Sequence, residues 1–250
     1  MRTRIKYGKR WFWRGSLFAL MAILFVALPL VFPKPLFSHS VTVGELSVHS
    51  DRPIPQAEGE QFLQEVQQKL AQSPIEADGM PMQIYITNTE WRWRWLWIVP
   101  NKDAGGFVAA PVTRRHTFFS GANFYTDELI SPTGYRTQPP RTLDYFGAHE
   151  LTHVATLETL GLIQFYQTPT WVIEGIADYV AMPPESAADL YAKIGEQDAD
   201  LAMMRAHGVY APYRLLVTYF LEEEGWSIDQ LLATDWTLGE ARAVVFPALR

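Results

Sequence analysis

Two histidines and a glutamate form the stretch His-Glu-Leu-Thr-His at residues 149–153. Residues four apart lie on the same face of a helix, so His149 and His153 can present imidazole nitrogens to one metal ion. Glu150 follows the first histidine and can reach a water molecule bound to that metal. Zinc lowers the pKa of such a water to about 7, and a carboxylate can take its proton during attack on a carbonyl. The motif therefore predicts a zinc site with Glu150 as general base.

A catalytic zinc takes three protein ligands and one water, so a third ligand is required. The chain contains no cysteine, which leaves His, Asp or Glu for that position. The apolar stretch at 170–180 contains Glu174 and Asp178, four residues apart. Carboxylates within an apolar stretch are costly unless they bind a metal or pair with another group. We predict that Glu174 is the third ligand and that Asp178 accepts the free N–H of a zinc-bound histidine.

Both motifs are expected on helices. Thr142 is a candidate N-cap for the first helix, and Gly161 is a candidate C-terminal stop. Thr168 can cap the second helix, and Pro169 suits its first position. The apolar residues of the first helix recur at helical spacing: Leu143, Phe146, Leu151, Val154, Leu157 and Leu160.

The segments that precede residue 141 read mainly as strands, and those that follow it read as helices. We expect strands within 41–50, 82–88, 105–111 and 115–121, and an earlier helix over 56–72. Strands followed by helices predict an α+β fold, with the zinc motif in the helical half. We expect a single domain that spans residues 41–250, which is long enough to bury a core of its own.

The N-terminal region differs from the rest of the chain. Residues 1–15 contain six cations and no acidic residue, and residues 16–32 contain no charge. We predict a transmembrane anchor over 16–32, with a basic cytoplasmic N-terminus and an exported domain. The alternative is a signal segment that is cleaved. All 27 acidic residues lie beyond this region, so the body of the chain is acidic, which argues against a nucleic-acid partner.

Tryptophan alternates with other residues in the segment 91–97, at Trp91, Trp93, Trp95 and Trp97. In a strand this alternation would place all four side chains on one face. That face would be either an aromatic part of the core or an exposed patch. An exposed patch could rest on a membrane surface, where indole rings are favoured.

The two motifs together resemble the gluzincin metallopeptidases, the thermolysin-like clan with a His-His-Glu zinc site. The pattern W-x-x-E-G-x-A-x-Y around Glu174 is similar to minimal bacterial domains of this type. The resemblance spans roughly residues 80–225 and implies zinc ligands His149, His153 and Glu174, with Glu150 as base and Asp178 as the outer carboxylate. It also implies a small mixed β-sheet whose edge strand, within 104–121, lies along the cleft, and a short helix at 89–98. Residues 154–159 lack the Gly and His that a metzincin requires.

Peptide hydrolysis also needs a hydrogen-bond donor for the oxyanion. His207, Tyr210, Tyr213 and Tyr219 are candidates, and the resemblance of 211–226 to the helix after the third ligand favours Tyr213. His116 is expected either to line the cleft or to be exposed on a strand. Arg114 and Arg115 are expected either to favour acidic substrate side chains or to be solvated turn residues.

These observations predict an enzyme, a zinc metallopeptidase with one zinc ion per chain that acts on a peptide or protein substrate. It would be anchored in the membrane by a single N-terminal helix, with the catalytic domain outside the cytoplasm. Secretion of the domain is the less favoured alternative. Two alternatives remain at this point. The first is a non-catalytic zinc-binding or interaction domain that keeps the gluzincin fold, and the second is a hydrolase with one dedicated client.

Overall fold

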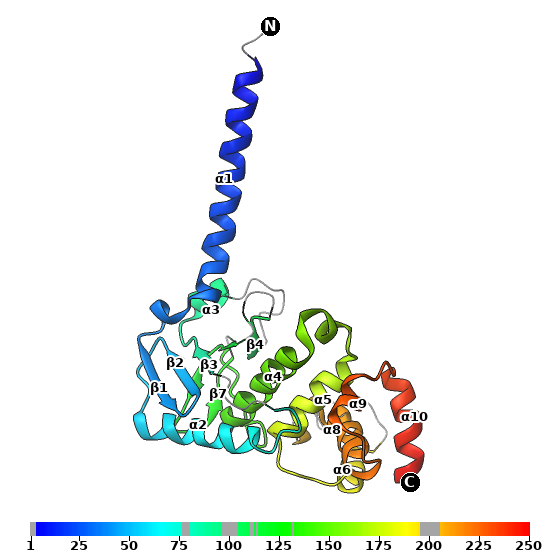
Figure 1. The fold of residues 1–250 in the computed structure, drawn as a ribbon. Coiled ribbons are helices and arrows are strands. Elements are labelled where there is room, and N and C mark those ends of the chain that lie inside the picture. Colours follow the sequence, from blue (N-terminus) through cyan, green and yellow to red (C-terminus); the bar gives the residue numbers. More distant parts are fainter. Residues whose placement is uncertain are drawn as a thin grey trace.

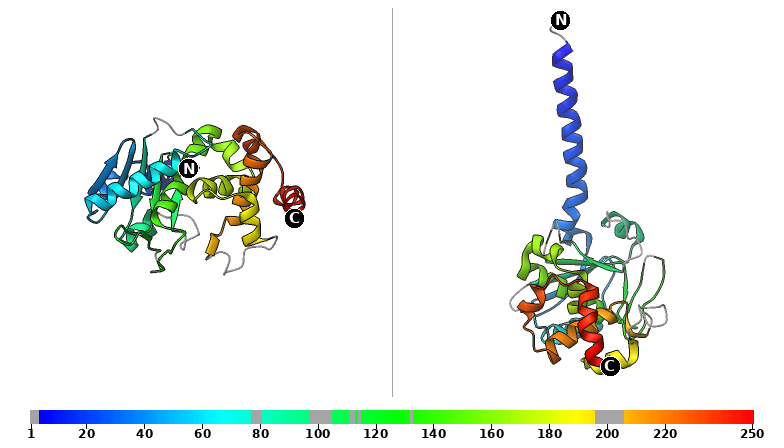
Figure 2. Two further views of the ribbon diagram at one scale, coloured as in Figure 1. Left: turned by 90° about the horizontal axis from the view of Figure 1, so that it is seen from below. Right: turned by 90° about the vertical axis from the view of Figure 1, so that its right-hand side faces the viewer.

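The computed structural model describes residues 4–76, 81–96, 105–110, 113, 115–131, 133–195 and 206–250. A long helix, α1 (Arg4–Val31), projects from a domain in which a β-sheet lies beside a group of helices (Figure 1). α1 and the end of α10 (Leu238–Leu249) lie at opposite ends of the molecule (Figures 1 and 2). Two residues of interest, Trp97 and Arg114, lie outside the described ranges.

The main sheet has five strands in the order β1-β2-β3-β5-β4. β1 and β2 form an antiparallel hairpin, β2, β3 and β5 run parallel, and β4 pairs antiparallel with β5 at the edge. The sheet is therefore mixed, as expected. A small separate ribbon is formed by β6 and β7. The strand bounds are β1 His39–Val43, β2 Leu46–Ser50, β3 Met82–Ile86, β4 Gly106–Val108, β5 His116–Phe119, β6 Ala122–Asn123 and β7 Glu128–Leu129.

Each face of the sheet is covered by a different set of helices. Ile84 and Phe119 belong to the main core with α2 (Gln56–Leu70) and α4 (Leu143–Gln167). Tyr85 and Phe118 point the other way, because side chains alternate along a strand. They pack with α3 (Glu90–Leu96) and with the end of α1. The short 3-10 helix η1 (Lys34–Leu36) connects α1 to the sheet.

The helical half is built on α4, α5 (Thr170–Ala181) and α8 (Ala211–Thr218), which pack against one another. Gly175 allows close approach of α5 to α8, since a Cβ at this position would lie 2.8 Å from the Tyr213 carbonyl oxygen. The remaining helical elements in the part of the chain that the structure describes are α6 Ala187–Ile194, the π-helical turn η2 Tyr219–Glu223, α9 Ile228–Leu232 and α10.

The expected α+β organisation is confirmed, with small differences at helix ends. Thr142 is the N-cap of α4, and Gly161 interrupts that helix with a φ of 74°, after which one further helical segment runs to Gln167. α5 begins at Thr170, with Pro169 as its N-cap, one residue later than predicted. The short helix that the resemblance implies at 89–98 is confirmed for the described part, because residues 90–96 form α3, and the alternative of a strand is wrong.

α1 contains residues 16–31 of the predicted anchor. Its side chains include exposed apolar groups on successive residues, among them Leu17, Phe18, Leu20, Met21, Ile23 and Leu24. Among the residues that the structure describes, no helix is both long enough and apolar enough to cross a membrane.

Candidate metal centre

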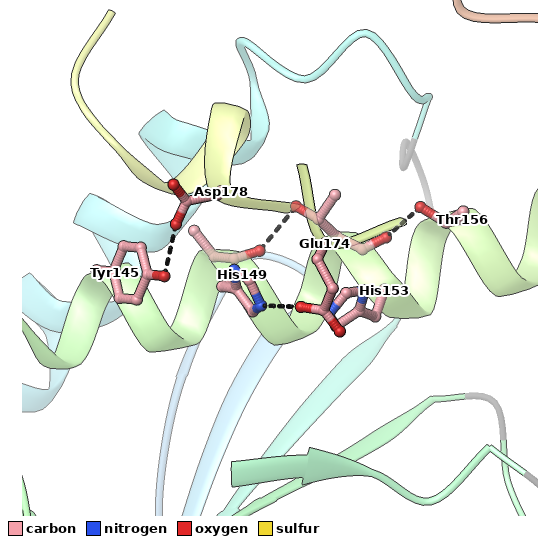
Figure 3. Close-up of polar contacts among 8 residues, drawn as sticks. Tyr145, His149, His153, Thr156, Glu174 and Asp178 are labelled. Carbon is pink, nitrogen blue, oxygen red and sulfur yellow. Dashed lines mark hydrogen bonds and ion pairs between the residues drawn. The ribbon is translucent and has the colours of Figure 1, made fainter. Parts of the chain in front are cut away.

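His149 and His153 lie one turn apart on α4 and face Glu174 on α5 (Figure 3). The Nε2 atoms of His149 and His153 lie 3.2 Å and 3.5 Å from Oε2 of Glu174. The two imidazole rings are almost perpendicular, with centroids 4.8 Å apart. Both histidines are buried, whereas part of the Glu174 side chain is exposed. The structure thus brings together the three side chains that the sequence predicts as ligands.

These three side chains fit a zinc ion by donor type and by spacing. Two imidazole nitrogens and one carboxylate oxygen form a donor set used by catalytic zinc, and their donor atoms lie within 4.8 Å of one another. Ligands about 2.0–2.1 Å from a tetrahedral ion are about 3.4 Å apart, close to the separations observed between Glu174 and each histidine. The residues therefore suit the metal.

The helices hold these side chains in place through buried contacts. Leu151 and Val154 face the core from α4, and Val172 and Ile176 do so from α5, which fixes the rotation of both helices. Thr152 adds a side-chain hydrogen bond to the Ala148 carbonyl within α4. The ligands consequently project from two packed helices and not from loops, which limits their movement.

The electrostatics of the site favour a cation where the three donors meet. Burial disfavours the charged form of Glu174, but hydrogen bonds from His149 and His153 outweigh this and hold its pKa well below the ordinary value. Burial also opposes protonation of His153, yet the hydrogen bond that its ring N–H donates to Glu174 and the charges of Glu174 and Glu150 raise its pKa. Negative charge thus surrounds the two imidazoles.

Glu150 lies beside the edge of the sheet. Burial raises the pKa of its carboxyl group, while the nearby His153 and His149 oppose that rise. A Cβ added to Gly106 on β4 would lie 3.3 Å from Oε1 of Glu150, so the backbone of β4 passes next to this carboxylate. A base with a raised pKa is better suited to take and return a proton near neutral pH.

A cavity of about 300 Å³ adjoins the side chains of Glu150, His153 and Glu174. One wall comes from Val108 and Ala110, at and after the end of β4. The other wall comes from the segment between α4 and α5 and from α5 itself, with Phe165, Tyr166, Thr168, Thr170 and Ile173. The edge strand expected along the cleft is therefore β4, and the wall residues are largely apolar.

Asp178 has different partners from those predicted. Its Oδ1 accepts a 2.7 Å hydrogen bond from the Tyr145 hydroxyl (Figure 3). Its Oδ2 lies 3.2 Å from Nη1 of the buried Arg214. Within the described part of the chain, Nδ1 of His149 and Nδ1 of His153 have no hydrogen-bond partner. Burial raises the pKa of Asp178, and the charges of Arg214 and His149 oppose that rise. Asp178 does not, however, hold the His149 imidazole by a hydrogen bond.

Tyr210 is the candidate tyrosine that lies against His149. Its ring stacks on His149 with centroids 5.3 Å apart and an interplanar angle of 10°. Burial, the charges of Glu174 and Glu150 and a hydrogen bond from its hydroxyl to Glu174 raise its pKa well above the ordinary value. Tyr213, which the sequence favours, instead stacks on the ring of Tyr210 at 6.1 Å.

The remaining candidates lie elsewhere. The Tyr219 hydroxyl donates a hydrogen bond to Glu224, and His207 lines a different cavity, between α6 and the start of α8. His116 is partly buried on the sheet face away from α4, where its Nδ1 lies 3.1 Å from the Leu30 carbonyl oxygen. Arg115 is half exposed, with Nε 3.8 Å from Oε1 of Glu158.

Comparison with models of known protein families and with curated proteins finds no match to this chain. The assignment of a chemistry to this site therefore depends on its residues and their geometry. Those residues are two imidazoles and one carboxylate that converge, a second carboxylate beside them, and a neighbouring tyrosine hydroxyl.

Proposed function

We propose that this chain is a zinc-dependent metallopeptidase. The observation that carries the proposal is the convergence of His149, His153 and Glu174 on one point beside Glu150 and an accessible cavity. A structural zinc site is usually closed by four protein ligands, whereas three protein ligands leave a position for water. One further carboxylate next to that position is what hydrolysis of a carbonyl compound requires.

A bound zinc ion supplies activation of water and polarisation of the scissile carbonyl. Glu150 accepts the proton of the attacking water and delivers it to the leaving amine. Tyr210 donates a hydrogen bond to the oxygen that becomes negative during the attack. Its raised pKa keeps the phenol protonated at neutral pH, which this role requires.

The substrate backbone lies in an extended conformation along β4, at the edge of the sheet. Among the strands that the structure describes, β4 is the last in the sheet and pairs with β5 on one side. One substrate side chain enters the cavity between Val108 and Ile173. Because these walls are largely apolar, we expect a preference for an apolar or aromatic residue next to the cleaved bond.

Metal analysis and peptide cleavage by the purified full-length chain test this function. We expect about one zinc per chain and cleavage of members of a peptide library. Glu150→Gln keeps the ligand set and should retain zinc but lose cleavage, whereas Glu174→Ala should lose zinc. Stoichiometric zinc without cleavage of any peptide by the wild-type chain would instead support a non-catalytic zinc domain.

A further inference from the structure

Aromatic side chains of α3 extend the apolar surface of α1 onto the domain. The ring of Phe25 on α1 packs on Trp95 with centroids 5.0 Å apart, and Trp95 in turn stacks with Trp91 at 6.1 Å. Trp91 is 58% exposed. Arg92 holds α3 in this position, because Nη1 donates a 2.9 Å hydrogen bond to the Leu36 carbonyl oxygen just after α1.

A second exposed apolar group lies at the C-terminal end of α4. After the break at Gly161, Ile163 is 76% exposed and Tyr166 is 63% exposed. This end of α4 lies on the same side of the domain as α3 and the base of α1 in two perpendicular views (Figures 1 and 2). Apolar groups on two separate elements therefore flank α1 at one end of the domain.

We propose that this end of the domain, which carries Trp91, Ile163 and Tyr166, rests on a phospholipid bilayer that the apolar part of α1 contacts. We call these three residues the lipid-facing surface. Tryptophan and tyrosine are the side chains most favoured at the boundary between headgroups and acyl chains. Exposed apolar residues scattered singly need no partner, but these three lie on two elements at the end of the domain from which α1 projects.

The distribution of apolar side chains on α1 favours lipid over a protein partner. Successive residues of a helix point about 100° apart, so exposed residues at 17, 18, 20, 21, 23 and 24 span about 220° of its circumference, more than the stripe of about 100° that a helix packed on one partner buries. A protein groove would cover one stripe, whereas lipid covers every side. The six cations within residues 1–14 also complement anionic headgroups.

The contact between Phe25 and Trp95 places α3 beside the last turns of α1. The six steps from Phe25 to Val31 rise about 9 Å, so α3 flanks roughly the last two turns before the domain begins. When apolar residues of α1 above this level contact lipid, the exposed face of α3 reaches the headgroups. The domain therefore meets the bilayer in one orientation and is not free to rotate on a flexible tether.

Site-specific labels test this orientation, and the absence of cysteine from the chain makes single-cysteine variants unambiguous. Trp91→Cys and Ile163→Cys probe the lipid-facing surface on two independent elements. Ala192→Cys is the matched control, since Ala192 is exposed on α6, at the end of the molecule opposite α1 (Figures 1 and 2). Each full-length variant carries an environment-sensitive fluorophore and is reconstituted into vesicles of phosphatidylcholine and phosphatidylglycerol, with or without brominated acyl chains.

We expect brominated lipid to quench the labels at 91 and 163 at least about twofold more than the label at 192. Equal quenching at all three positions, or labels at 91 and 163 that are shielded from water but not quenched by brominated lipid, would overturn the proposal. The second pattern would instead indicate a protein on this surface. The measurement uses no substrate, so it is independent of whether the chain is a peptidase.

Discussion

At the scale of single residues, Asp178 of α5 connects this helix to α4 and α8, and it does not hydrogen-bond to His149 or His153. It is fully buried on α5, and its two oxygens contact Tyr145 of α4 and Arg214 of α8. Arg214 is itself buried and also lies 3.9 Å from Oε2 of Glu185. Removal of one member of a buried ion pair leaves an uncompensated charge in the interior.

We therefore predict that Asp178→Asn destabilises the fold by about 3–5 kcal/mol, because Arg214 loses its buried counter-charge. Denaturant unfolding measures the difference. The double variant Asp178→Asn/Arg214→Met removes both charges and should recover more than half of the loss. If the double variant were no more stable than Asp178→Asn, the role of Asp178 would lie elsewhere than in this ion pair.

Tyr210 gives a sharper test of the chemistry. Tyr210→Phe keeps the stacked ring on His149 but removes the hydroxyl group that contacts Glu174. We expect a fall in kcat of about 10²–10³-fold with zinc content unchanged, as for loss of one oxyanion donor. Tyr213→Phe is the matched control and should change kcat little. A larger loss with Tyr213→Phe than with Tyr210→Phe would contradict the assignment.

The proximity of His149 and His153 could be predicted from sequence because their spacing is local, whereas the residues packed around them could not. His149 and His153 share one helix face by their separation alone. Tyr210 and Tyr213 are both near the start of one helix, and only the packing of α8 on α5 decides which ring meets His149. The partners of Asp178 come from two other helices, which no spacing within 170–180 indicates.

At the scale of secondary-structure elements, β4 requires a glycine where it passes the site. A Cβ at Gly106 would lie 2.6 Å from the Phe119 ring and 3.3 Å from Oε1 of Glu150. Gly106→Ala must displace the strand or the Phe119 ring and also crowds the Glu150 carboxylate, and a small misplacement of a catalytic group is costly. We predict a fall in kcat/KM of about tenfold or more with zinc retained. Gly239→Ala on α10, where the nearest atom is 3.9 Å away, is the control and should keep full activity.

The turn between β6 and β7 contains a carboxylate with a raised pKa. Burial, together with the charges of Asp144 and Glu65, raises the pKa of Asp127 from 3.8 to about 6. A folded-state pKa above the unfolded one means that the folded state prefers the protonated form. The contribution of Asp127 to the stability of the fold is therefore present below about pH 4 and is lost as the pH rises through about 6.

Asp127→Asn mimics the protonated form and also suits the positive φ of 51° at this position. We predict that the variant is more stable than the wild type by about 1 kcal/mol above pH 7, after allowance for partial solvent screening. The difference should vanish near pH 4, where both chains are uncharged at this position. Thermal unfolding at the two pH values measures it, and a stability difference that does not depend on pH would show that the charge of Asp127 is not its cause.

The tryptophan segment shows where pattern reasoning fails at this scale. Alternation of Trp and Arg fits a strand, yet the segment forms α3 and divides its side chains between three environments. Trp93 is buried in the core cluster behind the sheet, Trp91 is exposed, and Trp95 lies between Trp91 and Phe25. The deciding partner, α1, is distant in sequence, so the local alternation contains no information about it.

At the scale of the whole molecule, the order of strands and helices predicted the α+β fold because each element shows its own periodicity. The arrangement of α3, the end of α4 and α1 around one end of the domain depends on tertiary packing and could not be read from that order. This arrangement also matters for the site. Phe165 and Tyr166 line the cavity beside Glu150, and the exposed Tyr166 belongs to the lipid-facing surface.

The proposed peptidase and the proposed lipid contact together predict a preference for substrates held at the bilayer. A peptide tethered to lipid is confined to the bilayer surface that Tyr166 of the cavity wall would contact, which raises its effective concentration there. We expect cleavage of a lipid-tethered peptide by vesicle-bound chain to exceed that of the same soluble peptide by about tenfold or more at equal total concentration.

Ile163→Glu alters the lipid-facing surface without touching the cavity lining, so it should cleave the soluble peptide at the wild-type rate but lose most of the advantage for the tethered one. Equal cleavage of both peptides by the wild-type chain would refute the lipid orientation while leaving the peptidase assignment intact, whereas cleavage of neither would refute the peptidase assignment.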